Sequence, residues 1–217
     1  MSSSQRGVFI TVEGVEGVGK STNMAFIAER LEQANIPFIT TREPGGTPLA
    51  EDVRSLLLEP RQEVVAENTE LLLMFAARAQ HLGEVILPAL EKGQWVLCDR
   101  FTDATYAYQG GGRGISVNKI ADLENWVQGK VRPDLTILLD APIDIGMARA
   151  NKRGALDRFE QEKRQFFENV RNCYLTMAEE YSRYRLVDAS QDLANVQESI
   201  KLIVDEAIEL YGESRGS

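Results

Sequence analysis

The sequence of 217 residues contains one histidine and two cysteines, and it has no long apolar run. A single histidine, His81, argues against a histidine-based catalytic triad or a histidine-rich metal site, and we expect it on a helix surface. Cys98 and Cys173 are far apart and lack the spacing of a metal site, so we expect reduced thiols in a cytoplasmic protein. No stretch approaches the roughly 20 apolar residues of a membrane span, and no secretory signal is visible, so we expect no membrane partner.

Basic residues are outnumbered by acidic ones. There are 24 Lys and Arg against 33 Asp and Glu, a net charge of −9 at pH 7. This balance argues against nucleic acid as a partner, because nucleic-acid-binding proteins carry a basic face. A small anionic substrate stays compatible, since local arginines can override a net negative charge. The length and the hydrophobic content of 43% fit a single domain over residues 1–217, and we expect the polar residues 1–6 to be disordered.

A glycine-rich motif is the most informative stretch that the sequence does contain. Gly14-Val15-Glu16-Gly17-Val18-Gly19-Lys20-Ser21 matches the pattern G-x-x-x-x-G-K-[ST] at every fixed position. The β-branched run 8–12 before it is typical of a buried strand, and residues 22–31 after it have apolar side chains at helical spacing. The motif therefore lies between a strand and a helix, the context that identifies a phosphate-binding loop.

Such a loop binds the phosphates of a nucleoside triphosphate. Glycines let the backbone turn tightly, and several N–H groups then point into one concavity at the positive end of the helix. Lys20 is expected to reach the β- and γ-phosphates, and the Ser21 hydroxyl to join the shell of a Mg²⁺ ion. The residues expected to bind the triphosphate are Gly14, Val15, Glu16, Gly17, Val18, Gly19, Lys20, Ser21 and Thr22.

The remaining pattern alternates strands with helices. Four further strands are predicted at residues 38–41, 95–98, 135–139 and 185–187. Helical patterns separate them, the longest from about residue 67 to 91 and another from about 160 to 181. This alternation predicts an α/β fold with a five-stranded, mostly parallel sheet flanked by helices.

Polar residues follow the predicted strands, where ligands bind in open α/β sheets. The second strand ends in Arg42-Glu43-Pro44-Gly45-Gly46 and the third in Asp99-Arg100. Asp99 is suited to bind the Mg²⁺ shell or to orient the attacking group, and Arg100 offers a planar fork for a phosphate monoester. A plain ion pair at a strand end is the alternative for Asp99-Arg100.

A second glycine-rich stretch, Tyr106-Ala107-Tyr108-Gln109-Gly110-Gly111-Gly112-Arg113-Gly114, allows two interpretations. It is either a flexible loop or, given its aromatic rings and Gln109, part of a base or sugar pocket.

Residues 149–159 are basic within an acidic protein and include four cations in ten residues. The phosphate loop has no basic residue between Gly14 and Gly19, so other cations must neutralise the transferred phosphoryl group. We therefore expect a mobile lid over about 149–160, with Arg149 or Arg153 acting in the transition state. A solvated helix end is the alternative.

Taken in this order, the motifs resemble those of bacterial thymidylate kinases, members of the P-loop nucleoside monophosphate kinase family. The resemblance runs from about residue 8 to about 210 and rests on the phosphate loop, Arg42 to Gly46, Phe75-Ala76-Ala77-Arg78, Asp99-Arg100, Tyr108 to Gly114, Arg132-Pro133-Asp134 and Gly154 to Glu160. It implies the P-loop kinase architecture with a basic lid, phosphorylation of dTMP to dTDP with ATP and Mg²⁺, and a homodimer.

The resemblance also implies residue roles. Glu16 corresponds to the carboxylate that contacts the 3′-hydroxyl of the acceptor sugar, and Arg54 and Arg100 to the pair that holds the acceptor phosphate. Arg78 corresponds to the arginine that hydrogen-bonds the thymine ring. The expected substrate-binding residues are Glu16, Glu43, Arg54, Leu58, Phe75, Arg78, Arg100, Thr105, Tyr108 and Gln109. The expected catalytic residues are Lys20, Asp99, Arg100, Arg149 and Arg153, and the expected metal ligands are Ser21 and Asp99.

The sequence departs from the family at the stacking residue. Many members place a base-stacking phenylalanine four residues before the arginine, whereas here Phe75 is three before Arg78 and Met74 holds the other position. Both spacings lie on one helix face, so we expect Phe75 to stack on the base. In the lid, Asn151 stands where relatives have an arginine.

Two other functions compete with this one. A guanine-nucleotide switch needs the motif N-K-x-D, but the nearest match, Asn118-Lys119-Ile120-Ala121-Asp122, is one residue too long and lies in a predicted helix. A kinase with a different acceptor is the second alternative. A nucleoside acceptor would leave Arg54 and Arg100 without a charged partner in a closed site, which favours a monophosphate.

Overall fold

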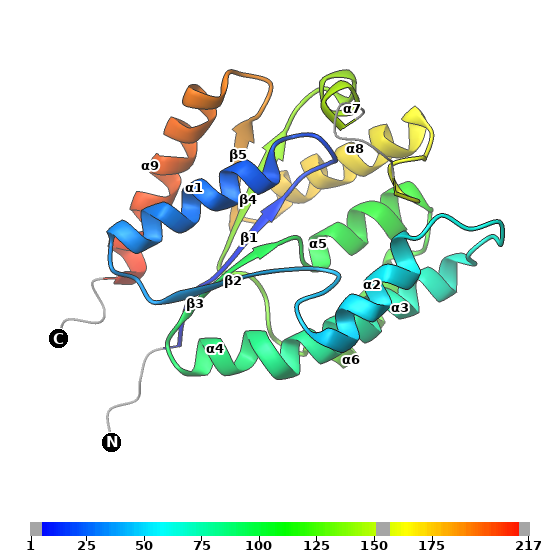
Figure 1. The fold of residues 1–217 in the computed structure, drawn as a ribbon, viewed down its shortest axis with the longest axis horizontal. Coiled ribbons are helices and arrows are strands. Elements are labelled where there is room, and N and C mark those ends of the chain that lie inside the picture. Colours follow the sequence, from blue (N-terminus) through cyan, green and yellow to red (C-terminus); the bar gives the residue numbers. More distant parts are fainter. Residues whose placement is uncertain (1–5, 151–156, 213–217) are drawn as a thin grey trace.

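Five parallel strands form the centre of this computed structural model, which describes residues 6–150 and 157–212 (Figure 1). Their order across the sheet is β2-β3-β1-β4-β5, and every neighbouring pair is parallel. The strands are β1 (Phe9–Glu13), β2 (Phe38–Arg42), β3 (Trp95–Asp99), β4 (Leu135–Asp140) and β5 (Tyr184–Asp188). The predicted five-stranded α/β sheet is confirmed.

Helices connect the strands and cover both faces of the sheet (Figure 1). The α-helices are α1 (Lys20–Gln33), α2 (Pro48–Leu58), α3 (Glu67–His81), α4 (Leu87–Glu91), α5 (Thr102–Thr105), α6 (Val117–Gln128), α7 (Ile143–Ala150), α8 (Arg164–Glu180) and α9 (Leu193–Gly212). Two π-helical segments are η1 (Leu82–Ile86) and η2 (Tyr106–Gly112). The predicted helix over 67–91 is confirmed as the continuous run of α3, η1 and α4.

Alternating side chains of β1 divide the core between the two faces. Ile10 and Val12 belong to the cluster that contains Ile27 of α1 and Ile200 of α9. In Figure 1, α1 and α9 lie side by side over that face of the sheet. Phe9 joins a second cluster with η1 and α4. This alternation follows from the two-residue period of a strand, and it directs Glu13 toward the same side as Phe9.

The glycine-rich stretch that was open to two interpretations is helical rather than a loop. α5 continues into η2. A Cβ atom at Gly112 would lie 2.4 Å from the ring of Phe166, and one at Gly111 would lie 2.8 Å from Cβ of Cys173. These glycines therefore permit a close approach between η2 and α8.

The structure also bears on the predictions for the N-terminal residues and for the two cysteines. Arg6, expected to be disordered, forms an ion pair of 2.9 Å with Asp134, whereas residues 1–5 lie outside the described part. Cys98 and Cys173 are free thiols, as predicted. Among the described helices, none combines the length and apolarity needed to cross a membrane.

Candidate active site

A cavity of about 520 Å³ opens at the carboxyl ends of the strands. Strand pairing explains the location: Val12, the next-to-last residue of β1, lies opposite Asp99, the last residue of β3, so these two central strands end at nearly the same level. β4 pairs with β1 on the other side and continues past Leu138, the partner of Glu13, to Asp140. The cavity is lined by residues of the phosphate loop and of the segments that follow β2 and β3, namely Glu16, Gly17, Gly19, Lys20, Ser21, Thr22, Arg42, Glu43, Pro44, Asp99, Arg100 and Phe101. The predicted convergence of polar strand ends is confirmed for these residues. Asp140, at the end of β4, is not among the residues that line the cavity and pairs with Arg171 at 2.7 Å.

The phosphate loop is held in place by close backbone packing. Gly17 has a φ of 75°, and a Cβ atom there would lie 2.0 Å from the carbonyl oxygen of Gly146 in α7. Only glycine fits both the positive φ and this contact. Val15 and Val18 of the same loop are buried in the core. Gly146 is a residue of the site that the sequence analysis missed, since nothing local marks a glycine that packs against a distant loop.

Lys20 lies at the first position of α1 and reaches back over the loop. Its Nζ atom donates to the carbonyl oxygens of Gly14 and Val15, both at 3.0 Å. Burial lowers the pKa of Lys20 to about 8, and the charge of Arg100 acts in the same direction. The amine therefore lies where phosphate oxygens would restore its charge.

Arg100 occupies a strained backbone position at the centre of the cavity. Its φ is 67°, in the left-handed region that non-glycine residues rarely adopt. Its guanidinium donates to Glu16 at 2.9 Å and to the hydroxyl of Tyr174 at 3.3 Å. It also lies 4.8 Å from the ring centroid of Tyr108, whose hydroxyl donates to both oxygens of Glu16 at 2.7 Å. Three side chains, from the phosphate loop, η2 and α8, thus hold one guanidinium group.

Glu13 hydrogen-bonds the backbone directly after Arg100. One oxygen of its carboxyl accepts from the backbone N–H of Phe101, and the other from the hydroxyl of Tyr174, both at 2.7 Å. Burial raises the pKa of Glu13 to about 8, and the neighbouring Asp103 acts in the same direction. Because Glu13 bonds the residue that follows Arg100, it positions that arginine without lining the cavity.

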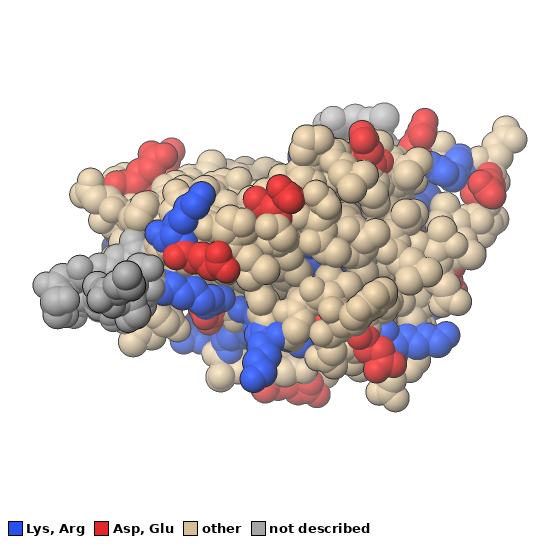
Figure 2. Space-filling view, turned by 90° about the horizontal axis from the view of Figure 1, so that it is seen from below, with Lys and Arg blue, Asp and Glu red and all other residues tan. Residues whose placement is uncertain are grey.

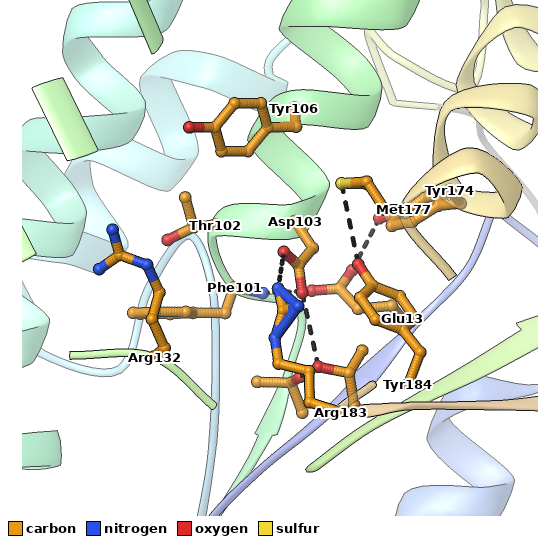
Figure 3. A network of polar contacts seen from close by, with 12 residues as sticks. Glu13, Phe101, Thr102, Asp103, Tyr106, Arg132, Tyr174, Met177, Arg183 and Tyr184 are labelled. Atoms are coloured by element: carbon orange, nitrogen blue, oxygen red, sulfur yellow. Dashed lines mark hydrogen bonds and ion pairs between the residues drawn. The ribbon is translucent and has the colours of Figure 1, made fainter. Parts of the chain in front are cut away.

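Figure 3 shows that this carboxyl lies in a larger network of polar contacts, and Asp103, Tyr174 and Tyr184 of this network are buried. Arg183 contacts Asp103 at 2.5 Å, and Tyr184 lies beside them with its hydroxyl on the sulfur of Met177. Residues of α5, α8 and the β5 region therefore meet under one strand end, and Glu13 and Tyr174 were not identified from the sequence. The one sequence signal was a charged residue at the end of an otherwise apolar strand.

Glu43 holds Arg78 and His81 together in the interior. Its carboxylate contacts Nε of Arg78 at 2.7 Å and Nδ1 of His81 at 3.1 Å. The expectation that His81 lies on a helix surface is wrong: the ring is fully buried and also hydrogen-bonds the hydroxyl of Thr41 at 2.7 Å. Polar partners on both ring nitrogens compensate for its burial.

Arg78 lines the cavity and keeps one donor atom without a protein partner among the described residues. Nε is on Glu43, Nη2 donates to Thr105 at 3.0 Å, and Nη1 is buried without a hydrogen-bond partner among the described residues. The guanidinium carbon lies 4.8 Å from the ring centroid of Phe75 and 5.2 Å from that of Phe101. A buried donor without a partner is costly in a native protein, so this atom is a candidate contact for a ligand.

Met74, rather than Phe75, lines the cavity among the described residues. Phe75 is packed in a core cluster with Leu71, Ile115 and Ile120, with its ring against Arg78. The expected stacking of Phe75 on a base does not fit this placement, because the one-residue offset turns the ring inward. Leu58, Thr105, Tyr108, Gln109 and Arg54 do line the cavity, and Arg54 donates to the carbonyl oxygen of Pro44 at 2.9 Å.

Part of the expected basic lid is described. Arg149, at the end of α7, lines the cavity and donates to the carbonyl oxygen of Ala189 at 2.9 Å. At the C-terminal end of the expected lid, Arg158 donates from its side chain and its backbone N–H to the carbonyl oxygens of Leu57 and Leu58 in α2. Arg153 lies outside the described residues, so its predicted role is not addressed by this geometry.

The residues that were predicted to bind Mg²⁺ both line the cavity. Oδ1 of Asp99 is buried and has no hydrogen-bond partner in the described part of the chain, while Ser21 is exposed at the start of α1. No group of three or more His, Cys, Asp and Glu side chains among the described residues could hold a metal ion by itself. This arrangement fits Mg²⁺, which keeps several waters and shares one or two protein oxygens with substrate phosphates.

A strand, a phosphate loop with Lys20 and Ser21, and a charged cavity beyond parallel strand ends together define a P-loop kinase. The sequence profile of one such family, thymidylate kinase, matches residues 12–200. The chain belongs to the thymidylate kinase family.

Individual relatives agree over nearly the whole chain. The thymidylate kinase of Pseudomonas fluorescens strain Pf0-1 is 60% identical over 97% of this chain and 99% of the relative. The thymidylate kinase of Pseudomonas syringae pv. tomato strain DC3000 is also 60% identical, over 94% of this chain and 98% of the relative. The family resemblance inferred from the motifs is confirmed.

Proposed function

We propose that the cavity binds ATP with Mg²⁺ at the phosphate loop and dTMP at its other end, and transfers the γ-phosphoryl group to give dTDP and ADP. Membership of the thymidylate kinase family makes the chain an ATP-dependent kinase that phosphorylates dTMP. The assignment of individual residues rests on the cavity. The observation that carries it is the continuous lining from Lys20 and Ser21 at one end to Arg78 and Gln109 at the other.

At the donor end, backbone N–H groups of residues 14–22 and Lys20 hold the β- and γ-phosphates. Ser21 and Asp99 would hold Mg²⁺, which supplies charge neutralisation across the phosphates when bound. Among the described lid cations, Arg149 is the best placed to neutralise the transferred phosphoryl group, because it lines the cavity and its hydrogen bond there goes to a backbone carbonyl and not to a carboxylate.

At the acceptor end, Arg54 and Arg100 bind the phosphate of dTMP through their guanidinium forks. Glu16, held by Arg100 and Tyr108, accepts from the 3′-hydroxyl of the sugar. An oxygen of the acceptor phosphate then attacks the γ-phosphorus in line, the bond to the β–γ bridging oxygen breaks, and ADP leaves. Positioning and charge neutralisation supply most of the catalysis, since little covalent chemistry falls to the protein.

The base lies between Leu58, Met74 and Arg78. Nη1 of Arg78 is the donor to O4 of the ring, and Leu58 and Met74 supply apolar contacts for the ring and its methyl group. Tyr108 crowds the 2′ position and disfavours ribonucleotides. One methyl group contributes only about 1–3 kcal/mol of discrimination, so dUMP should be a weaker but measurable acceptor.

Steady-state phosphoryl transfer with ATP and Mg²⁺ tests the proposal, with dTMP, dUMP, dCMP, dGMP, AMP and thymidine as acceptors. The largest kcat/KM should belong to dTMP. Thymidine should be inert, because it has no phosphate group for Arg54 and Arg100 to bind. Lys20→Met serves as the inactive control. Transfer to another acceptor with none to dTMP would retain the phosphate loop and overturn the acceptor assignments, and a preference for GTP as donor would favour a guanine-nucleotide protein.

We also propose that the chain forms a homodimer through α3 and α6. Leu72, Val117 and Trp126 of these two packed helices are more than half exposed, and Trp126 is 82% exposed. A large exposed aromatic side chain of this kind is typical of an interface. Light scattering should give the dimer mass for the parent protein and the monomer mass for Trp126→Asp.

A cytoplasmic location without membrane or nucleic-acid partners stays part of the same proposal. The two free thiols support a reducing compartment. Figure 2 shows one face of the molecule, on which basic and acidic side chains are interspersed and wide areas carry neither. Binding of duplex DNA at physiological salt would contradict this part of the proposal.

A further inference from the structure

Glu70 is a buried carboxylate that the proposed reaction does not use. It lies in the first turn of α3, and the residue is only 1% exposed. Three side chains from other segments meet it. Nε2 of Gln109 lies 2.8 Å from Oε1, Arg113 lies 3.3 Å from both oxygens, and Arg158 forms an ion pair of 2.7 Å with Oε2.

The contact with Glu70 determines which end of the Gln109 amide faces the cavity. An amide has a donor end and an acceptor end, whereas an ionised carboxylate only accepts. Because two arginines also contact Glu70, its oxygens are acceptors, and the NH₂ group of Gln109 must turn toward them. The carbonyl oxygen of Gln109 is then the end left for the cavity, which this residue lines.

Together with Arg78, this orientation gives the cavity a defined hydrogen-bond pattern. Nη1 of Arg78 is a donor without a partner in the described chain, and Oε1 of Gln109 is an acceptor. Thymine and uracil present the complement, with O4 as acceptor and N3–H as donor. Cytosine presents the opposite at both positions, an N4 amino donor and an N3 acceptor.

We propose that Glu70 is a specificity-determining positioning residue, which fixes the amide of Gln109 so that the pocket accepts thymine and uracil and rejects cytosine. The inference rests on the proposed base pocket and adds the group that orients it. A flipped amide would face N3–H of thymine with a second donor, and the mismatch of buried polar groups is what makes such sites selective.

The test compares kcat/KM for dTMP, dUMP and dCMP in the parent enzyme and in Glu70→Gln. The new amide can donate to Gln109, so the Gln109 side chain loses its single orientation. The ratio of dTMP to dCMP should fall by about tenfold or more. The ratio of dTMP to dUMP should stay constant, because the two bases share this edge. Both ratios are independent of the fraction of folded enzyme.

Glu162→Gln is the matched control. Glu162 contacts Arg113 at 2.5 Å, whereas the side-chain amide of Gln109 donates to Glu70, so this variant disturbs the same charge cluster and should keep the parent dTMP-to-dCMP ratio. In a Gln109→Leu background, Glu70→Gln should change the ratio no further, because the two residues act as one unit. If Glu70→Gln does not fold, Glu70→Asp keeps the charge, withdraws the carboxylate from Gln109 and should lower the ratio in the same direction.

An unchanged dTMP-to-dCMP ratio in Glu70→Gln, beside a parent enzyme that prefers dTMP, would overturn the role of Glu70 and leave the base pocket intact. A further fall in the Gln109→Leu background would also overturn it. A parent enzyme without preference between dTMP and dCMP would instead refute the pocket assignment on which the inference rests.

Discussion

The proposed donor end of the cavity is formed by consecutive residues of one loop, whereas the proposed acceptor end is assembled from side chains of distant segments. Residues 14–22 offer backbone N–H groups, and their geometry depends on glycines and on one close contact with Gly146. The acceptor end depends on ion pairs such as Glu43 with Arg78 and Glu16 with Arg100. A site made of local backbone is specified by a motif, and a site made of side-chain networks is specified by the fold.

The largest expected effect tests whether a change at the acceptor end leaves ATP binding at the donor end intact. Arg100→Met should lower kcat/KM for dTMP by about 10³-fold, because removing one partner of a desolvated charge pair costs about 2–5 kcal/mol. The Kd of ATP, measured by calorimetry, should change little. Arg164→Met is the control, since that exposed arginine pairs with Asp144 and Glu168 away from the cavity and should have parent kinetics. A parallel loss of ATP affinity in Arg100→Met would show that the ends are not separable.

Gly17→Ala addresses the donor end in the same way. The added methyl group would meet the carbonyl oxygen of Gly146 at 2.0 Å and displace the loop. A displacement of about 1 Å costs about 10²-fold, so kcat/KM for ATP should fall by that factor while dTMP still binds. Gly83→Ala is the control, because a Cβ atom there meets nothing within 4 Å. Parent kinetics for Gly17→Ala would contradict the described packing.

The pH dependence of kcat/KM for ATP tests the charge of Lys20 at the donor end. The pKa of Lys20 is lowered from 10.5 to about 8, so the amine of the free enzyme loses its proton as the pH rises through 8. kcat/KM for ATP should then decline by about tenfold per pH unit above that value. In Lys20→Arg the guanidinium keeps its charge, and whatever activity is left should show no decline in this range. The same decline in both enzymes would assign it to another group.

The smallest expected effect concerns the contribution of Glu13 to the stability of the folded protein. The pKa of Glu13 is raised from 4.5 to about 8, so the native protein keeps a proton that the unfolded chain releases above 4.5. The stabilisation is complete below pH 4.5 and is lost progressively as the pH rises to 8. Glu13→Gln should therefore flatten the decline of the melting temperature over that range, and the exposed Glu29→Gln should not. Parallel curves for parent and Glu13→Gln would refute the shift.

The sequence was sufficient for the features that depend on local pattern. The five strands, the helix over 67–91 and the phosphate loop follow from side-chain period and from one motif. The strand ends also identified Asp99 and Arg100, because parallel strands bring their carboxyl ends to one edge.

The features that the sequence did not reveal all depend on contacts between distant segments. His81 was expected at a surface because no local signal shows that Glu43, 38 positions away, contacts its ring. Phe75 was expected in the cavity, but a one-residue offset on α3 puts Met74 there instead. The 106–114 stretch was left open between a flexible loop and part of a base or sugar pocket, and nothing in its sequence showed that its glycines permit a close contact with α8. Burial by tertiary neighbours decided each of these outcomes.

Calorimetric titration of ATP with Mg²⁺, and separately of dTMP, into Lys20→Met and Arg78→Met tests the central claim most directly. Lys20→Met should lose most of its affinity for ATP and keep that for dTMP, while Arg78→Met should show the reverse. Opposite losses of affinity in the two variants would establish that the two ends of the cavity bind their ligands independently. Loss of both ligands in either variant would contradict the account and show that the loop and the side-chain network form one cooperative unit.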